Sequence, residues 1–236
     1  MTKGDCINME LETKGDYTNI ELDIGAIEGL KKMPVDMFDG VYLSESCENA
    51  LILCVDLRNF SLFVHAQEDE VVSKLIKDFT SNLLSCINQF GYNCSYYKFL
   101  GDGVLVIWDE TSEETINEAL SIFDTYTEFL GEDLFKSYSA LGLGGALVEE
   151  KVFKYEISAE VAELKYRDYV GYGINLACRL QGLAGIDVLI LNEKLVKSRG
   201  IPFRVDESQL VLKELQLLKG LKENDRKQLL LYNRVS

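Results

Sequence analysis

The stretch YYKFLGDGVLVIW, residues 96–108, constrains the fold more than any other part of the sequence. Two apolar runs flank Gly101-Asp102-Gly103, and two such runs joined by a short glycine-containing turn are typical of a β-hairpin. Their nearly continuous apolar character predicts strands that are covered on both faces. The chain therefore places the carboxylate of Asp102 at the tip of a buried hairpin, and its use depends on whether a second carboxylate lies beside it.

The segments around this hairpin alternate between strand-like and helix-like patterns. Residues 50–57 (ALILCVDL) form a short apolar run that predicts a buried strand, and residues 68–90 place apolar side chains at helical spacing. A second amphipathic helix is predicted over 112–130 and a further strand over 138–149. The resulting order, β-α-β-β-α-β, predicts an α+β fold with a ferredoxin-like core. We expect three additions to that core: a helix over 171–184 and strands at VLILN and RKQLLLYNRV.

The first residues of the chain differ from the rest. TKGDCINMELE (2–12) recurs as TKGDYTNIELD (13–23), and the alternation of apolar residues in both copies predicts two short strands. We therefore expect an acidic N-terminal arm with a short internal repeat over residues 1–47. We expect a single domain over 48–236, because a segment of this length ordinarily folds around one hydrophobic core.

Charge and composition exclude several classes of function. The formal net charge is −15, so the phosphates of a nucleic acid would repel the chain. There is no apolar run long enough to span a bilayer and no secretory signal, and we expect a cytoplasmic protein without a membrane partner. The six cysteines form no C-x-x-C pair. His65 is the only histidine and lies beyond the end of a predicted strand, which argues against a Ser-His or Cys-His catalytic site.

A second carboxylate does occur at a matching place. Asp56 ends the apolar run 50–57, and in a ferredoxin-like sheet the first strand lies beside the central hairpin that carries Asp102. Two divalent ions about 4 Å apart need hard oxygen ligands to bridge them, and carboxylates at adjacent strand ends supply these ligands. The pair predicts a site for two divalent metal ions.

Three stretches together resemble the class III nucleotidyl cyclases, the catalytic domains of adenylate and guanylate cyclases, over roughly residues 48–234. The resemblance implies an enzyme that converts a nucleoside triphosphate to a 3′,5′-cyclic nucleotide and pyrophosphate by two-metal catalysis. The stretches are VDLRNFS (55–61), KFLGDGVLVIW (98–108) and RDYVGYGINLACRLQGLA (167–184).

The resemblance also implies a role for individual residues. Asp56, Asp102 and the backbone carbonyl of Leu57 are expected to bind two Mn²⁺ or Mg²⁺ ions as cofactors. Asn175 is expected to orient the ribose, and Arg179 to stabilise the negative charge on the transferring phosphorus. These two lie four residues apart and hence on one face of a helix, and a planar, permanently charged arginine suits that role.

Lys98 and Asp168 fall where the family recognises the edge of the nucleobase. A donor beside an acceptor matches adenine and cytosine, whereas guanine and uracil present the reverse pattern. Uracil in a shifted pose also satisfies both groups, with Lys98 on a carbonyl and Asp168 on the ring N–H. ATP, CTP and UTP therefore remain open as substrates.

The sequence departs from the family pattern around the triphosphate. Ala140 stands where many members carry a triphosphate-binding arginine. A phosphate-contacting lysine near the last hairpin matches either Lys219 or Lys222, and the register does not decide between them. Either the triphosphate is held differently from the family pattern or the activity is modest.

The family works as head-to-tail dimers, so the resemblance implies a homodimer with two shared sites. One subunit would supply the metal aspartates and the other the base-reading and transition-state residues. Without a sensor or membrane segment in this sequence, the chain also resembles the small pyrimidine cyclases of Pycsar antiphage systems, which make cyclic CMP or cyclic UMP. An adenylate cyclase that makes cyclic AMP is the alternative.

Two other interpretations fit less well. A diguanylate cyclase would carry a different hairpin from LGDG, and Asn175 and Arg179 would have no use in it. A non-catalytic nucleotide-sensing or dimerisation module would be favoured by loss of a metal aspartate or of Arg179, and the chain keeps all of them.

Overall fold

A computed structural model describes residues 40–129, 136, 138, 140–159, 164–200, 210–213 and 229–233. The repeat at residues 2–23 and the two candidate lysines, Lys219 and Lys222, lie outside these ranges. Among the described helices, none combines the length and the apolar character that a membrane span requires. In chain order the elements are β1 (Gly40–Arg58), α2 (Phe60–Ala66), α3 (Asp69–Phe90), β2 (Tyr96–Phe99), β3 (Gly103–Trp108), α4 (Glu113–Phe129), β4 (Gly142–Ala159), β5 (Leu164–Val170), α5 (Tyr172–Gln181), β6 (Val188–Leu191), α6 (Glu193–Arg199), β7 (Leu210–Lys213) and β8 (Leu229–Asn233).

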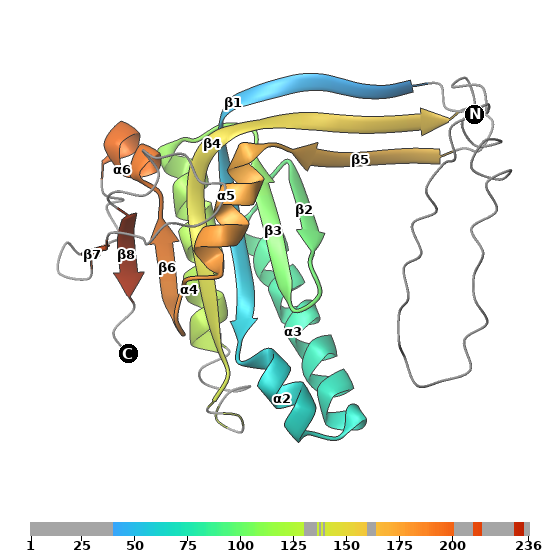
Figure 1. Cartoon of the computed structure of the whole chain (residues 1–236), viewed down its shortest axis with the longest axis vertical. Coiled ribbons are helices and arrows are strands. Elements are labelled where there is room, and N and C mark those ends of the chain that lie inside the picture. Colours follow the sequence, from blue (N-terminus) through green and yellow to red (C-terminus); the bar gives the residue numbers. More distant parts are fainter. Residues whose placement is uncertain are drawn as a thin grey trace, which may run out of the picture.

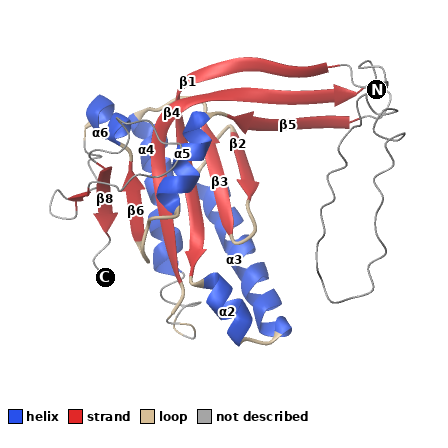
Figure 2. Cartoon of the chain, in the orientation of Figure 1, coloured by secondary structure: helices blue, strands red, loops and turns tan. Residues whose placement is uncertain are grey.

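The strands form an eight-stranded sheet with the order β2-β3-β1-β4-β6-β8-β7, and β5 pairs with β4 outside this path. The segment β2-β3-β1-β4 has the strand order of a ferredoxin-like sheet, with β1 antiparallel to both of its neighbours. Figures 1 and 2 show this sheet at the centre of the molecule with helices packed against it. The α+β fold with a ferredoxin-like core is thus confirmed.

Strand β1 divides the core into two layers because successive side chains point to opposite faces of a strand. Leu51, Leu53 and Val55 pack in a cluster with apolar residues of α3 and α4. Ile52 and Cys54 pack in a second cluster with apolar residues of α5. The sheet is therefore covered on both sides at β1 and β3, as the apolar runs predicted. For β2 the prediction was wrong, because this strand lies at the edge of the sheet and is only partly buried. Asp56 lies on the α5 side by the same alternation.

Three strands extend beyond the core as a ribbon. The first half of β1, the second half of β4 and all of β5 run together away from the helices (Figure 1). The sequence analysis predicted strands only over 50–57 and 138–149 in these elements and missed the extensions, although Phe153, Tyr155 and Ile157 alternate with polar residues. The expected boundary at residue 47/48 falls inside β1, while the division into an arm and a domain stays a prediction.

Buried polar side chains fix two of the helices. Glu118 of α4 is 4% exposed, and it accepts hydrogen bonds from the indole Nε1 of Trp108 (2.8 Å) and from Nδ2 of Asn93 (2.6 Å). Asn93 adds a third bond from its backbone N–H (3.2 Å). This carboxylate therefore joins α4 to β3 and to the turn before β2, with its acceptor oxygens satisfied.

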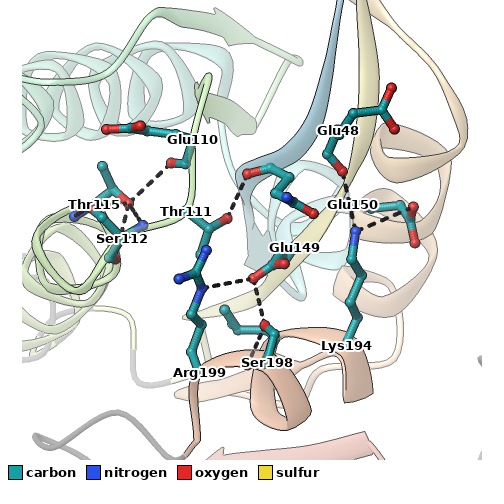
Figure 3. Close-up of polar contacts among 12 residues, drawn as sticks. Glu48, Glu110, Thr111, Ser112, Thr115, Glu149, Glu150, Lys194, Ser198 and Arg199 are labelled. Carbon is teal, nitrogen blue, oxygen red and sulfur yellow. Dashed lines mark hydrogen bonds and ion pairs between the residues drawn. The ribbon is translucent and has the colours of Figure 1, made fainter.

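The short helix α6 is joined to β4 in the same way (Figure 3). The Oγ of Ser198 donates to Glu149, which is 2% exposed, at 2.8 Å, and Nε of Arg199 lies 3.5 Å from the same carboxylate. A buried carboxylate is tolerated here because a hydroxyl and a guanidinium both compensate its charge.

Candidate active site

The two predicted metal carboxylates lie at the same end of adjacent strands. Asp56 of β1 is in register with Gly103, the first residue of β3, and Asp102 directly precedes that glycine. The backbone N–H of Leu57 donates to the carbonyl of Asp102 at 3.1 Å. A Cβ at Gly103 would lie 2.5 Å from the carbonyl oxygen of Val55, so only glycine allows this close approach. The strand ends that carry Asp56 and Asp102 are therefore adjacent, as expected from the ferredoxin-like strand order.

Burial and a neighbouring charge both act on Asp56. Its pKa is raised mainly because burial disfavours the charged form, and the charge of Asp102 raises it further. The amide Nε2 of Gln181 donates to Oδ2 of Asp56 at 2.9 Å and opposes this rise. Arg58 opposes it as well, with Nη1 4.0 Å from the same oxygen. A cation between the two carboxylates would relieve their repulsion.

The donor set fits Mn²⁺ or Mg²⁺. Asp56 and Asp102 offer carboxylate oxygens, which these hard cations prefer. Leu57 follows Asp56 directly and buries its side chain in the core, so only its backbone could take part. Across the described ranges, no group of three or more His, Cys, Asp or Glu side chains could hold a metal ion. Water, backbone oxygens or the phosphates of a substrate would have to complete the coordination.

Arg58 and Gln181 connect this end of β1 to helix α5. The Nη2 of Arg58 donates to the backbone carbonyl of Gln181 at 2.5 Å. A cation at the C-terminal end of a helix is favoured by the helix dipole and by the carbonyls that lack a helical partner. The guanidinium lies so close to Gly144 that a Cβ there would be 2.2 Å from its Nε. The side chains of Arg58 and Gln181 both contact Asp56, and Arg58 also binds the last residue of α5.

The predicted base-reading pair is also brought together. The Nζ of Lys98 on β2 lies 2.5 Å from Oδ2 of Asp168 on β5. The hydroxyl of Tyr166 donates to the same oxygen at 2.6 Å, and the hydroxyl of Tyr96 donates to Oδ1 at 2.8 Å. Burial alone would raise the pKa of Asp168, but these hydrogen bonds outweigh it and lower the pKa to about 2. The hydrogen bond to Asp168 in turn raises the pKa of Lys98.

Helix α5 presents its two candidate residues on the side away from the sheet. Its buried face packs on β1 and β4, and a Cβ at Gly173 would lie 2.7 Å from Cδ1 of Ile52. Asn175 and Arg179 are exposed, whereas Gly173, Leu176, Ala177, Leu180 and Gln181 are buried. Asn175 and Arg179 therefore share one face, as predicted, and that face is turned away from the Asp56 of the same chain.

The surroundings of Ala140 are built from the backbone. Its carbonyl oxygen accepts a hydrogen bond from Nδ2 of Asn59 at 2.7 Å, and Asn59 has a left-handed conformation with φ 63°. Ala140, which departs from the family pattern expected from the sequence, is thus part of a polar contact between the end of β1 and the start of β4.

Sequence reasoning missed four polar residues of this region, and three of them had a detectable signal. Tyr96, Tyr166 and Arg58 each lie two residues from a predicted site residue on the same strand, so strand periodicity places them on the same face. Gln181 carries no such signal, because its contact with Asp56 spans 125 residues.

The architecture is that of the catalytic domains of class III adenylyl and guanylyl cyclases. No family model matches the sequence, and no curated protein matches it. The adenylyl cyclase CyaB from P. aeruginosa is similar in structure, with a TM-score of 0.63 and 16% identity over 82% of this chain and 98% of that one. The guanylyl cyclase Cya2 gives 0.61 and 17% over 80% and 91%. A dimeric guanylyl cyclase domain from Blastocladiella emersonii gives 0.59 and 12% over 80% and 98%. At these identities the likeness establishes the fold.

Proposed function

We propose that the protein is a nucleotidyl cyclase, which converts a nucleoside triphosphate to a 3′,5′-cyclic nucleotide and pyrophosphate. The observation that carries this proposal is the pairing of Asp56 with Asp102 at one end of adjacent strands, within a fold that adenylyl and guanylyl cyclases share. In the reaction the ribose 3′-oxygen bonds to the α-phosphorus, the bond from that phosphorus to the β-phosphate oxygen breaks, and the 3′-hydroxyl loses its proton.

The residues of the chain divide this work. Asp56 and Asp102, with the carbonyl of Leu57, would hold two divalent ions, which when bound acidify the 3′-hydroxyl and neutralise the triphosphate. Arg179 would donate hydrogen bonds to the non-bridging oxygens of the α-phosphate as their charge grows, and Asn175 would orient the ribose. For the triphosphate we propose Lys219 or Lys222, with no arginine at position 140.

The base would be recognised by the network around Asp168. Lys98 supplies a donor and Asp168 an acceptor, which together suit cytosine and adenine, and a shifted uracil also satisfies them. The hydroxyls of Tyr96 and Tyr166 already donate to this carboxylate, so they would adjust when a base enters. We propose a pyrimidine cyclase that acts on CTP or UTP in a Pycsar-type antiphage system, with an adenylate cyclase as the alternative. Because adenylyl and guanylyl cyclases share the fold, the fold alone does not indicate which nucleobase is bound.

The active form would be a homodimer. Asn175 and Arg179 lie on the face of α5 that is turned away from the sheet, so a second copy would bring them to the metal carboxylates. A mixture of Asp56→Ala and Arg179→Ala chains tests this arrangement, since each mixed dimer would retain one intact site. Random association would restore about a quarter of the wild-type rate. A mixture that stays inactive, while the wild type turns over, would refute the shared site.

The activity itself is tested by incubating the protein with Mn²⁺ and each of ATP, CTP, GTP and UTP, followed by identification of the products by mass. We expect a cyclic product from CTP, UTP or ATP. Asp56→Asn and Asp102→Asn should abolish it, whereas Asp69→Asn, at an exposed helix position, should not. A product from GTP alone would contradict the roles of Lys98 and Asp168, and no product from any nucleotide would favour a non-catalytic nucleotide-sensing module.

A further inference from the structure

Two thiols lie in contact where α5 packs on β1. Five of the chain's six cysteines fall within the described residues. The Sγ of Cys54 on β1 donates to the Sγ of Cys178 on α5 at 3.8 Å. Cys54 is 3% exposed, whereas Cys178 is only partly buried, so Cys178 is the more exposed residue of the pair. The contact joins residues that are 124 positions apart and therefore exists only in the folded chain.

The position of this pair links it to the ends of both elements. Residues 54, 56 and 58 of β1 share the face that α5 covers, and each makes a contact with the helix: Cys54 with Cys178, Asp56 and Arg58 with Gln181. A disulfide between Cys54 and Cys178 would therefore add a covalent link to the contacts that already hold the last turns of α5 on β1.

We propose that Cys54 and Cys178 are a redox-sensitive modification site that forms a reversible disulfide on exposure to a hydroperoxide and pins α5 to β1. Disulfides that form in reducing compartments are usually transient, and they are catalytic or redox-sensing. The other described cysteines, Cys47, Cys86 and Cys94, are assigned no part in it.

With hydrogen peroxide as the hydroperoxide, the chemistry needs one equivalent of it. The thiolate of Cys178 attacks a peroxide oxygen, which breaks the O–O bond and leaves a sulfenic acid on Cys178 and a hydroxide ion, protonated to water. The sulfur of Cys54 then attacks the sulfenic sulfur, forming the S–S bond and breaking the S–O bond. The hydroxide that leaves takes up the proton of Cys54 as a second water. Two thiols are oxidised, and the peroxide is reduced to two waters.

The surroundings favour Cys178 as the sulfur that reacts first. The hydrogen bond from Cys54 outweighs the effect of burial and lowers the pKa of Cys178, which favours the thiolate at this sulfur. The partial exposure of Cys178 acts in the same direction, since peroxide must reach the attacking sulfur.

The test uses the full chain in a Cys6→Ser background, which removes the thiol outside the described residues. After treatment with hydrogen peroxide, we expect two of the five remaining thiols to be lost, with a mass decrease of two hydrogens and one cross-linked peptide pair that contains Cys54 and Cys178. Dithiothreitol should restore both thiols. Cys178→Ser should abolish the cross-link, and the matched variant Cys94→Ser, at a partly buried thiol on the other face of the sheet, should retain it.

Pinning of α5 is measured by hydrogen exchange of its backbone amides. Oxidation should slow exchange over residues 172–183 by about tenfold in the wild type and leave Cys178→Ser unchanged, because a cross-link suppresses local opening. Circular dichroism shows whether Cys178→Ser is folded, and Cys178→Ala serves as a second variant if it is not. Retention of all thiols, a cross-link between other cysteines, or unchanged exchange of α5 would overturn the proposal. None of these readouts depends on nucleotide turnover, so the proposal is tested even if the chain is not a cyclase.

Discussion

Replacement of Asp168 by asparagine should destabilise the protein in a pH-dependent way. The carboxylate accepts hydrogen bonds from Lys98, Tyr166 and Tyr96, and its pKa is lowered from 3.8 to about 2. A pKa change of one corresponds to about 1.4 kcal/mol, so the hydrogen bonds to Asp168 stabilise the folded state by at most about 2.5 kcal/mol. Because the side chain of Lys98 is 41% exposed, solvent screens the pair, and we expect about 1 kcal/mol.

The direction with pH follows from the lowered pKa. A carboxylate that is more acidic in the folded state stabilises the fold fully above the pKa of the unfolded chain, near pH 4. This contribution is lost as the pH falls through about 2. Near pH 3 about half of it should remain.

Urea unfolding followed by circular dichroism, at pH 7, 5 and 3, measures this effect. Asp168→Asn should lower the free energy of unfolding by about 1 kcal/mol at pH 7 and 5, and the difference from the wild type should narrow at pH 3. The control is Glu156→Gln, which removes a more exposed ion pair with Arg167 between β4 and β5 and should cost about 0.5 kcal/mol or less. Equal stability of Asp168→Asn and wild type at pH 7, or a difference that does not change with pH, would refute the reasoning.

Three further changes test the core and the site. Glu118→Ala should lower the free energy of unfolding by about 2–3 kcal/mol, because the buried indole N–H of Trp108 loses its acceptor; a urea midpoint equal to that of wild type would contradict this. Gly103→Ala should weaken Mn²⁺ binding, measured by electron paramagnetic resonance, since its Cβ would collide with a β1 carbonyl 2.5 Å away and part Asp56 from Asp102; unchanged affinity would argue against it. Arg58→Met should speed hydrogen exchange at the end of α5, where the guanidinium now holds the last carbonyl; protection equal to that of wild type would show that the contact is dispensable.

Several elements could be predicted from the sequence because their signals are local. The helical spacing over 68–90 predicted α3, observed at Asp69–Phe90, and the pattern over 112–130 predicted α4, observed at Glu113–Phe129. The Gly-Asp-Gly turn between apolar runs predicted the β2–β3 hairpin. In each case the signal is the spacing of apolar residues and glycines within one short segment of the chain.

The ribbon of β1, β4 and β5 shows where local signals fail. The alternation of Phe153, Tyr155 and Ile157 with polar residues is a local strand signal in β4. The pairing across the ribbon joins segments that are far apart in the chain, so no local pattern shows it. The short helices α2 and α6 were missed because seven residues are too few for a periodic pattern to stand out.

The order of the core elements and the two candidate carboxylates, Asp56 and Asp102, could be predicted from short segments, since an acid beside an apolar run is a local feature. The surroundings of these two carboxylates depend on the packing of the folded chain. Gln181 meets Asp56 across 125 residues, Lys98 meets Asp168 across 70, and Cys54 meets Cys178 across 124. Such contacts depend on which helix packs on which strand and in what register, and that choice is made by the burial of the whole chain rather than by any short segment of it.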